Sequence, residues 1–248
     1  MVLFFVFLFG LVTGSFLNVL ITRLPAGKSI ASPPSHCEAC GTTLQARDLI
    51  PVISWLFLRG KCRYCGQPIP YWFPLTEFVN GVVWVGLVWQ FGLTCKGMAG
   101  LFLFSLFLVI ALIDLQHQII PNGLVLTLLA GGIIYHFGSE ELSLFQRLLG
   151  LAVGLTVLLL IALLSRGGMG GGDIKLLAVM GFWLGLGGVL ATLFLAALIG
   201  SIVGIVLIIS GRKKRKDPIP FGPFLAIGFL LVFLYGEQLM NLYWGISR

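Results

Sequence analysis

The chain has 248 residues, of which 58% are hydrophobic and only 10% are charged, and its formal net charge is +7. A water-soluble domain needs about 25% charged residues to cover its surface, so this composition excludes an ordinary soluble enzyme. The mean hydropathy is +1.04. Successive apolar runs, each close to the roughly 20 residues that cross the hydrocarbon of a bilayer, indicate a polytopic membrane protein.

These runs predict an all-α protein with about eight transmembrane helices. The run at residues 2–21 has no basic residue before it, and Arg23 and Lys28 follow it, so we expect a retained first helix rather than a cleaved signal peptide. The other runs cover residues 73–92, 98–114, 119–137, 145–164, 174–187, 189–209 and 219–236. The run at 174–187 is short, and the glycine-rich stretch GLGG at 185–188 is compatible with a tight turn or with a break in a longer helix.

The basic residues predict the orientation, because Lys and Arg are enriched in cytoplasmic loops. With eight helices and the N-terminus outside, thirteen of the sixteen basic residues are cytoplasmic: Arg23, Lys28, Arg47, Arg59, Lys61, Arg63, Arg166, Lys175, Arg212, Lys213, Lys214, Arg215 and Lys216. An odd number of helices would remove this bias. The positive charge therefore reflects topology and gives no reason to expect nucleic-acid binding. The basic run at 212–217 is read as a stop signal for the preceding helix, or as a contact with anionic membrane lipid.

The predicted organisation is a first transmembrane helix at 1–22, a cytoplasmic loop domain at 23–72 and a membrane-embedded domain at 73–248. The loop domain contains two Cys-x-x-Cys pairs, each followed by glycine: Cys37, Cys40, Cys62 and Cys65. Such pairs are typical of a tetrahedral zinc site, in which each tight turn supplies two thiolates. Two disulfides or four free thiols are the alternatives, but disulfides are rare in the reducing cytosol. Four sulfur ligands leave no open position, so we expect structural zinc that stabilises a small loop domain.

Acidic residues in or beside the predicted helices are Glu77, Asp114, Asp173 and Glu237. Ionisable groups in the membrane are costly and usually functional. In the eight-helix arrangement Asp114 ends the third helix and Asp173 begins the sixth, so both lie at the same depth on the cytoplasmic side. Two carboxylates brought together share a proton, and such a pair can activate a water and protonate a leaving amine. The pair predicts an aspartic protease.

The glycines Gly170, Gly171 and Gly172 directly precede Asp173. They let another backbone approach closely, as an extended peptide substrate must, and we expect a mobile loop that carries Asp173 towards Asp114. The alternative for Asp173 is an ordinary helix N-cap. The alternative for Asp114 is a polar residue at the membrane interface.

Several stretches together resemble the bacterial type IV prepilin peptidases, over nearly the whole chain. They are GSFLNVLITRLP at 14–25, the cysteine pairs around DLIPVISWLFLRGKC at 48–62, YWFPLTE at 71–77, IDLQHQIIPN at 113–122, MGGGDIK at 169–175 and FGPFLAIG at 221–228. The resemblance implies that Asp114 and Asp173 are the catalytic aspartates, the second in a G-x-G-D-type motif. The family often has aspartate where this chain has Asn122, which leaves Asp114 as the carboxylate of the first motif.

The resemblance also implies an activity in the bacterial cytoplasmic (inner) membrane. Family members cut the basic leader from prepilins or from type II secretion pseudopilins after a glycine, on the cytoplasmic side. They then usually methylate the new N-terminal residue, commonly phenylalanine, with S-adenosylmethionine. Asn18 and Glu77 match family positions and are weak candidates for the methyl-donor site, or else they pack helices together. Nothing in the sequence predicts an oligomeric state.

Two rival hypotheses follow from the sequence. The first is a peptidase without methyltransferase activity. The second is a metal or proton transporter, in which Asp114, Asp173 and Glu77 line a path across the membrane. A transporter predicts carboxylates at several depths, whereas the two aspartates share one depth.

Overall fold

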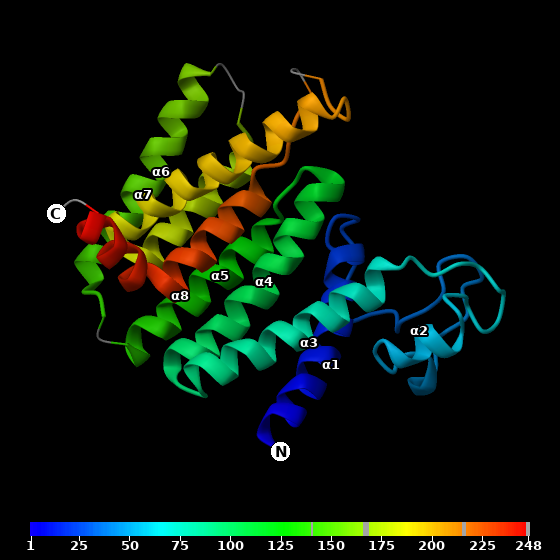
Figure 1. The fold of residues 1–248 in the computed structure, drawn as a ribbon. Coiled ribbons are helices and arrows are strands. Elements are labelled where there is room, and N and C mark those ends of the chain that lie inside the picture. Colours follow the sequence, from blue (N-terminus) through cyan, green and yellow to red (C-terminus); the bar gives the residue numbers. More distant parts are fainter. Residues whose placement is uncertain (140, 166–168, 215–216, 247–248) are drawn as a thin grey trace. The chain divides into compact units, whose positions relative to one another are not determined.

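The computed structural model describes residues 1–139, 141–165, 169–214 and 217–246, and for residues 240–246 it describes the backbone only (Figure 1). Three basic residues used to predict the orientation, Arg166, Arg215 and Lys216, lie outside these ranges. The described residues contain no strand, which confirms the predicted all-α class. The helices are α1 (Val2–Arg23), η1 (Ala46–Asp48), α2 (Ile53–Phe57), α3 (Trp72–Phe91), α4 (Cys95–His117), α5 (Asn122–Gly138), α6 (Leu144–Leu164), α7 (Gly171–Ile209) and α8 (Gly222–Ile246).

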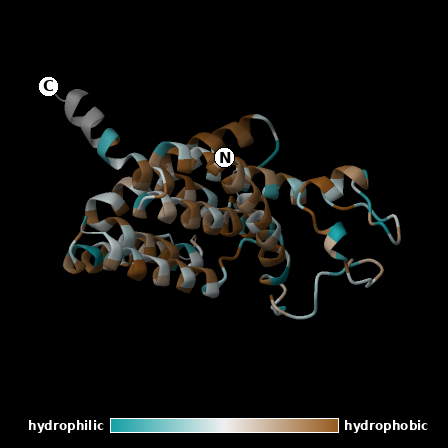
Figure 2. Ribbon diagram, turned by 90° about the horizontal axis from the view of Figure 1, so that it is seen from below, coloured by the Kyte–Doolittle hydropathy of each residue, from teal (hydrophilic) through white to brown (hydrophobic). Residues whose placement is uncertain are grey.

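Five of these helices are long and apolar enough to cross a membrane: α1, α4, α6, α7 and the Gly222–Leu239 part of α8. α5 is apolar but shorter. α3 has 20 residues, and the buried polar side chains Thr76, Glu77 and Asn80 interrupt its apolar character. Apolar residues predominate along the helices in Figure 2. Large apolar side chains such as Phe194 (67% exposed) and Ile209 (80% exposed) lie on the protein surface, as expected for residues that face lipid.

The chain divides into two units, Met1–Val109 and Ile110–Arg248, so α4 contributes to both. In the first unit α1 and α3 lie so close that a Cβ at Gly14 would be 2.6 Å from the Glu77 Cα. Asn80 links the helices of this unit: its Nδ2 donates to the Gly10 carbonyl at 2.8 Å, and its Oδ1 accepts from the Ser105 hydroxyl at 2.9 Å. Small residues and interhelical hydrogen bonds of this kind are the usual means of helix association in membranes.

In the second unit α7 reverses direction at Gly185, whose backbone is non-helical (φ 68°, ψ −172°). Met169 precedes this residue by sixteen positions and Ser201 follows it by sixteen, yet both line one groove, so the two halves of α7 lie side by side. Positive φ is readily adopted by glycine, which explains why the chain turns here. The structure thus places the sequence-predicted interruption at Gly185, where two helices meet within α7.

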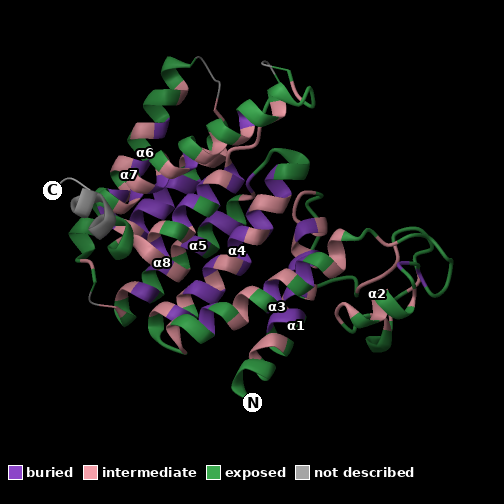
Figure 3. Cartoon of the chain, viewed as in Figure 1, coloured by how far each residue is buried: buried purple, intermediate pink, exposed green. Residues whose placement is uncertain are grey.

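The first half of α7 is the most deeply buried part of this unit, as Figure 3 shows, and residues 176–183 are all buried. It lies against α6 through glycines: a Cβ at Gly150 would be 2.7 Å from the Gly185 Cα. Trp183 joins this half to α5, because its indole N–H donates to the Leu128 carbonyl at 2.9 Å. Its ring also contacts Phe229 on α8 edge to face, at 6.4 Å between centroids.

Arg147 on α6 is fully buried where α7 turns. Its Nη1 donates to the carbonyls of Phe182 and Trp183, both at 3.3 Å. The last carbonyls of a helix have no partner within that helix. Nη2 donates to the Ser139 hydroxyl at 3.2 Å, and Nε lies 3.1 Å from the His136 Nδ1. Arg147 therefore caps the first half of α7, a role that was not predicted from the sequence, where Arg147 is one of the three basic residues left on the outer side.

Replacing Arg147 by Met should destabilise the protein, because the capped carbonyls lose their donor while staying buried. Each unsatisfied buried polar group costs about 1–3 kcal/mol. We expect the midpoint of thermal unfolding in detergent, followed by tryptophan fluorescence, to fall by about 5–10 °C. Lys28→Met removes an exposed cation and is the matched control, which should unfold at the wild-type temperature. Equal midpoints for the two variants would contradict the capping role.

Candidate active site and metal centre

Asp114 lies near the end of α4 and is 5% exposed. Its Oδ2 accepts a hydrogen bond from the Gly222 backbone N–H at 2.9 Å. Gly222 is the first residue of α8, and the first N–H groups of a helix have no partner within it. A Cβ at Gly222 would lie 2.7 Å from that same Oδ2, so any larger residue here would displace the carboxylate. The sequence analysis did not single out Gly222, although the Gly222–Pro223 pair is typical of a helix start.

Asp173 is the third residue of α7, and the helix N-cap is Gly170. The alternative that Asp173 is the N-cap is therefore wrong. The expectation of a mobile glycine loop also needs correction, because Gly171 and Gly172 already belong to the first helical turn. A carboxylate in this turn interacts favourably with the helix dipole. Asp173 Oδ1 is buried and accepts no hydrogen bond among the described residues, so it keeps its capacity to bind a water or a substrate group.

The two carboxylates belong to the same unit. The segment after α4 also packs against the start of α7: a Cβ at Gly172 would be 3.0 Å from the Ile120 Cβ. The expectation that the glycines before Asp173 admit a substrate backbone stays a prediction. Asn122, at the start of α5, accepts a hydrogen bond from the Lys175 ammonium at 3.2 Å. Chemically, the arrangement offers two carboxylates at helix ends: the buried Asp114, oriented by a backbone donor, and the half-buried Asp173, with one free oxygen.

The four cysteines of the loop lie in two turns with the same hydrogen bonds. Cys37 N–H donates to the Thr42 carbonyl at 3.0 Å, and Gly41 N–H donates to the Cys37 carbonyl at 2.8 Å. Cys62 and Gly66 repeat the pattern at 2.8 and 3.0 Å, with Gln67 as the acceptor for Cys62. Gly41 and Gly66 both have positive φ (69° and 73°), as expected for the glycine after each pair. All four cysteines are free thiols, so the alternative of two disulfides is not found.

The sulfur atoms of Cys37, Cys40, Cys62 and Cys65 all lie within 4.8 Å of one another, so they could hold a metal ion. In a tetrahedral site with metal–sulfur bonds of about 2.3 Å, neighbouring sulfurs are roughly 3.8 Å apart. The Sγ atoms of Cys37 and Cys65 are 3.8 Å apart. The donor set and its spacing therefore fit a four-sulfur metal site.

The electrostatics of the cluster also suit a cation. Hydrogen bonds from the hydroxyl and backbone of Thr42 lower the pKa of Cys40 to about 6. The Gln67 backbone N–H acts to lower the pKa of Cys65, but desolvation and the other three cysteines raise it to about 12. Like charges in one cluster oppose each other's ionisation, and a bound cation removes that opposition.

Asp48 ties the second cysteine turn to the rest of the loop. Its Oδ1 forms an ion pair with Arg63 Nε at 2.6 Å, and its Oδ2 accepts from the Tyr64 hydroxyl at 3.0 Å. The hydrogen bond from Arg63 lowers the pKa of Asp48 below its usual value. Because Arg63 and Tyr64 lie between Cys62 and Cys65, these bonds hold the second pair of sulfurs in place.

Glu77 and Asn18, the weak candidates for cofactor binding, lie together in the first unit. Glu77 Oε2 accepts from the Val52 backbone N–H at 2.7 Å, which ties the loop to α3. Asn18 Nδ2 donates to the Phe73 carbonyl at 3.0 Å and lies 3.5 Å from Glu77 Oε1. Asn18 Oδ1 is buried without a partner among the described residues. Both side chains therefore join elements of this unit, and the Asn18 Oδ1 can still accept a hydrogen bond.

Comparison with known proteins identifies the family to which this chain belongs. A model described as the Bacterial Peptidase A24 N-terminal domain matches residues 8–91, and a model described as the Type IV leader peptidase family matches residues 101–205. A protein named "Prepilin leader peptidase/N-methyltransferase" from Bacillus subtilis (strain 168) is 36% identical over 237 residues, which are 96% of each chain. The chain belongs to the type IV leader peptidase family.

Other members of the leader peptidase family match to a similar extent. Proteins with the same name are 36% identical in Xanthomonas campestris pv. campestris, over 94% of this chain and 91% of theirs, and 35% identical in Pseudomonas aeruginosa, over 95% and 91%. No solved structure matches the chain. The two family models cover both the cysteine loop and the helices that carry the aspartates.

The purified full-length protein should carry one metal ion per chain, measured by inductively coupled plasma mass spectrometry. Cys62→Ser removes the buried ligand and should abolish the bound metal. Cys95→Ser is the control, because Cys95 is a free, exposed cysteine that is not part of the cluster. Full metal content in Cys62→Ser, or equal loss in both variants, would contradict the four-sulfur site.

Proposed function

We propose that this protein is a membrane aspartic endopeptidase that removes the leader peptide from type IV prepilins or pseudopilins and then N-methylates the new N-terminal residue. The curated relatives at 34–36% identity share the name prepilin leader peptidase/N-methyltransferase over most of their length, which supports both activities. The observation that carries the peptidase activity is the pair of carboxylates: the buried Asp114, which accepts a hydrogen bond from the Gly222 N–H, and the half-buried Asp173, whose Oδ1 is free. A transporter finds no support in the comparisons.

In the proposed reaction the carboxylate pair carries one shared proton. The ionised member takes a proton from a water, and this water attacks the carbonyl of the glycine that precedes the scissile bond. The protonated member donates a hydrogen bond to the carbonyl oxygen and then transfers its proton to the leaving amine. The apparent pKa values belong to the pair rather than to either residue. Asp173 Oδ1 is the atom free to hold the water or the carbonyl, while the Gly222 N–H orients Asp114.

Methyl transfer needs S-adenosylmethionine, which supplies an electrophilic methyl group to the new amine. Asn18 and Glu77 are the candidates for the methyl-donor site, since the buried Asn18 Oδ1 can accept a hydrogen bond and Glu77 can attract a positive sulfonium. The rival, a peptidase that does not methylate, predicts a mature substrate without one added methyl group by mass spectrometry.

The four cysteines are proposed to hold zinc in a structural role. Thiolates favour zinc among the common divalent ions of the cytosol, and a shell of four sulfurs leaves no position for a substrate. The metal would hold together the two cysteine turns of a loop that has little core of its own, with only Cys62 and Gly60 buried between residues 24 and 70.

We further propose eight membrane crossings in the bacterial inner membrane, with both termini outside and the aspartates and the cysteine loop on the cytoplasmic side. The reversal of α7 at Gly185 supports two crossings within that element, since 39 residues of straight helix would be about 58 Å long, nearly twice the hydrocarbon thickness. The domain boundaries proposed from the sequence, 1–22, 23–72 and 73–248, go with this topology.

Asp114→Asn and Asp173→Asn test the proposed pair, because asparagine keeps the shape and removes the acid–base function. Each variant should lower the rate of leader removal from a co-expressed prepilin by at least about 100-fold. Gel mobility and the mass of the pilin measure the product. Normal unfolding midpoints would show that the variants are folded. Wild-type cleavage by either variant would contradict the mechanism.

Gly222→Ala tests the orienting donor. Its Cβ would lie 2.7 Å from Asp114 Oδ2 and must displace that carboxylate, so leader removal should slow by at least about tenfold. Gly236→Ala on the same helix is the matched control, since its Cβ would meet only Val232 Cγ1, at 3.8 Å. Equal rates for the two variants would mean that the Gly222 contact does not position Asp114.

A further inference from the structure

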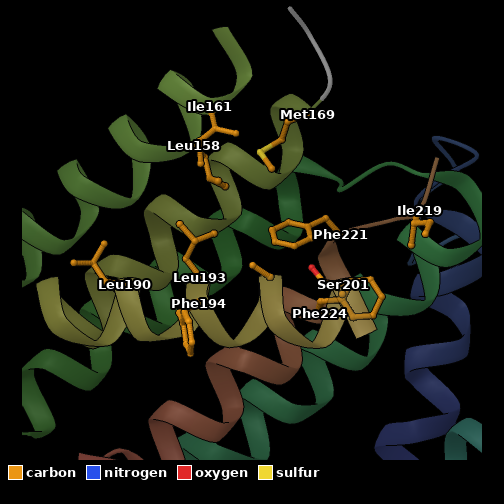
Figure 4. Close-up of a pocket in the computed structure, with 12 residues that line it drawn as sticks. Leu158, Ile161, Met169, Leu190, Leu193, Phe194, Ser201, Ile219, Phe221 and Phe224 are labelled. Atoms are coloured by element: carbon orange, nitrogen blue, oxygen red, sulfur yellow. The ribbon is translucent and has the colours of Figure 1, made fainter. Parts of the chain in front are cut away.

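The second unit contains an apolar groove of about 640 Å³ that the proposed chemistry does not use (Figure 4). Its walls are α6, the second half of α7, the start of α8 and the segment before it, with Met169 at the end nearest the start of α7. Its lining residues are Leu158, Ile161, Met169, Leu190, Leu193, Phe194, Ala197, Gly200, Ser201, Ile219, Phe221 and Phe224. None of these carries a charge, and a single hydroxyl, that of Ser201, is polar.

Two lining residues of the groove, Met169 and Phe221, are the chain neighbours of glycines that approach the two carboxylates. Met169 is followed by Gly170, at which a Cβ would lie 3.4 Å from Asp173 Oδ2. Phe221 is followed by Gly222, whose N–H donates to Asp114. Met169 and Phe221, which precede the two glycines that approach Asp173 and Asp114, therefore both line the groove.

The groove extends along α7 from Ser201 to Leu190. Eleven residues of helix cover about 16 Å, which matches roughly five residues of extended chain or three turns of a helix. Leu190 and Phe194 are 45% and 67% exposed, so the groove is open towards the lipid-facing surface.

We propose that this groove binds the apolar segment of the substrate polypeptide that remains in the membrane beyond the scissile bond. This inference rests on the proposed peptidase function. A chain cut at the ends of membrane helices has one part outside the bilayer and one part within it, and the part within must lie against apolar surface. The groove offers that surface beside the carboxylate contacts of Gly170 and Gly222.

An acyl chain of a lipid is the other occupant that an apolar groove in a membrane could take. The position of Met169 and Phe221 next to both carboxylate contacts favours the substrate, because a lipid site has no need to begin at the reacting groups. The two occupants give different outcomes in kinetics, since only a substrate site changes KM when it is filled.

Ala197→Trp fills the groove, and Leu198→Trp places the same side chain at the next position of α7, outside the groove. With a purified prepilin as substrate, Ala197→Trp should raise KM at least about tenfold with kcat little changed, while Leu198→Trp keeps wild-type values. A wild-type KM for Ala197→Trp would overturn the proposal, and it is also the outcome expected for a groove that holds only lipid.

A cross-linking experiment locates the segment without cleavage. A prepilin with a photoreactive phenylalanine analogue among the first residues beyond the cut is mixed with full-length Asp114→Asn protein. Cross-links should map to residues 190–201 and 219–224, and Ala197→Trp in the same background should remove them. Cross-links confined to other helices would overturn the groove assignment.

The two proposals fail separately. If Asp114→Asn still removes the leader at the wild-type rate, the peptidase mechanism is wrong. If Asp114→Asn is inactive while Ala197→Trp has a wild-type KM, the mechanism stands and the groove inference alone is wrong.

Discussion

The hydrogen bond from the Gly222 N–H to Asp114 joins the start of α8 to the end of α4, and the candidate site depends on it. A buried carboxylate needs donors, and in a membrane the protein itself must supply most of them. A helix start provides such a donor without adding charge. The same contact brings Phe221 beside the pair, so the apolar groove and the carboxylates are positioned by one stretch of chain. Asp173 approaches from a second helix start, with Gly172 close to Ile120.

Buried polar backbone groups also need hydrogen-bond partners at the turn of α7. The reversal at Gly185 leaves carbonyls without helical partners, and Arg147 supplies donors to Phe182 and Trp183. Glycine contacts such as Gly150 against Gly185 bring α6 close enough for that side chain to reach. The first half of α7 thus carries Asp173 in its first turn, and its last carbonyls accept hydrogen bonds from Arg147 of α6. In the first unit the cysteine loop is held by its own two turns, by Asp48 and by the bond from Val52 to Glu77.

Local pattern predicted much of this molecule. Apolar runs predicted the all-α class and most helix positions, and the Cys-x-x-Cys spacing predicted the cluster of Cys37, Cys40, Cys62 and Cys65. The features that depend on tertiary contact were missed. Arg147 reads as an ordinary basic residue at the start of a helix until α7 is seen to end against it, and Gly222 reads as a helix start until Asp114 is seen beside it. The glycines before Asp173 read as a loop because glycine has a low helix propensity, yet the helix already begins at Gly171.

The central claim is that Asp114 and Asp173 act as one catalytic unit. Single-turnover rates of leader removal by Asp114→Asn, Asp173→Asn and the double variant test it most directly. If the two carboxylates share one proton and one water, removing either disables the pair, and the double variant should be no slower than the slower single variant. Losses that multiply in the double variant would contradict the account, because they would show two carboxylates that contribute independently.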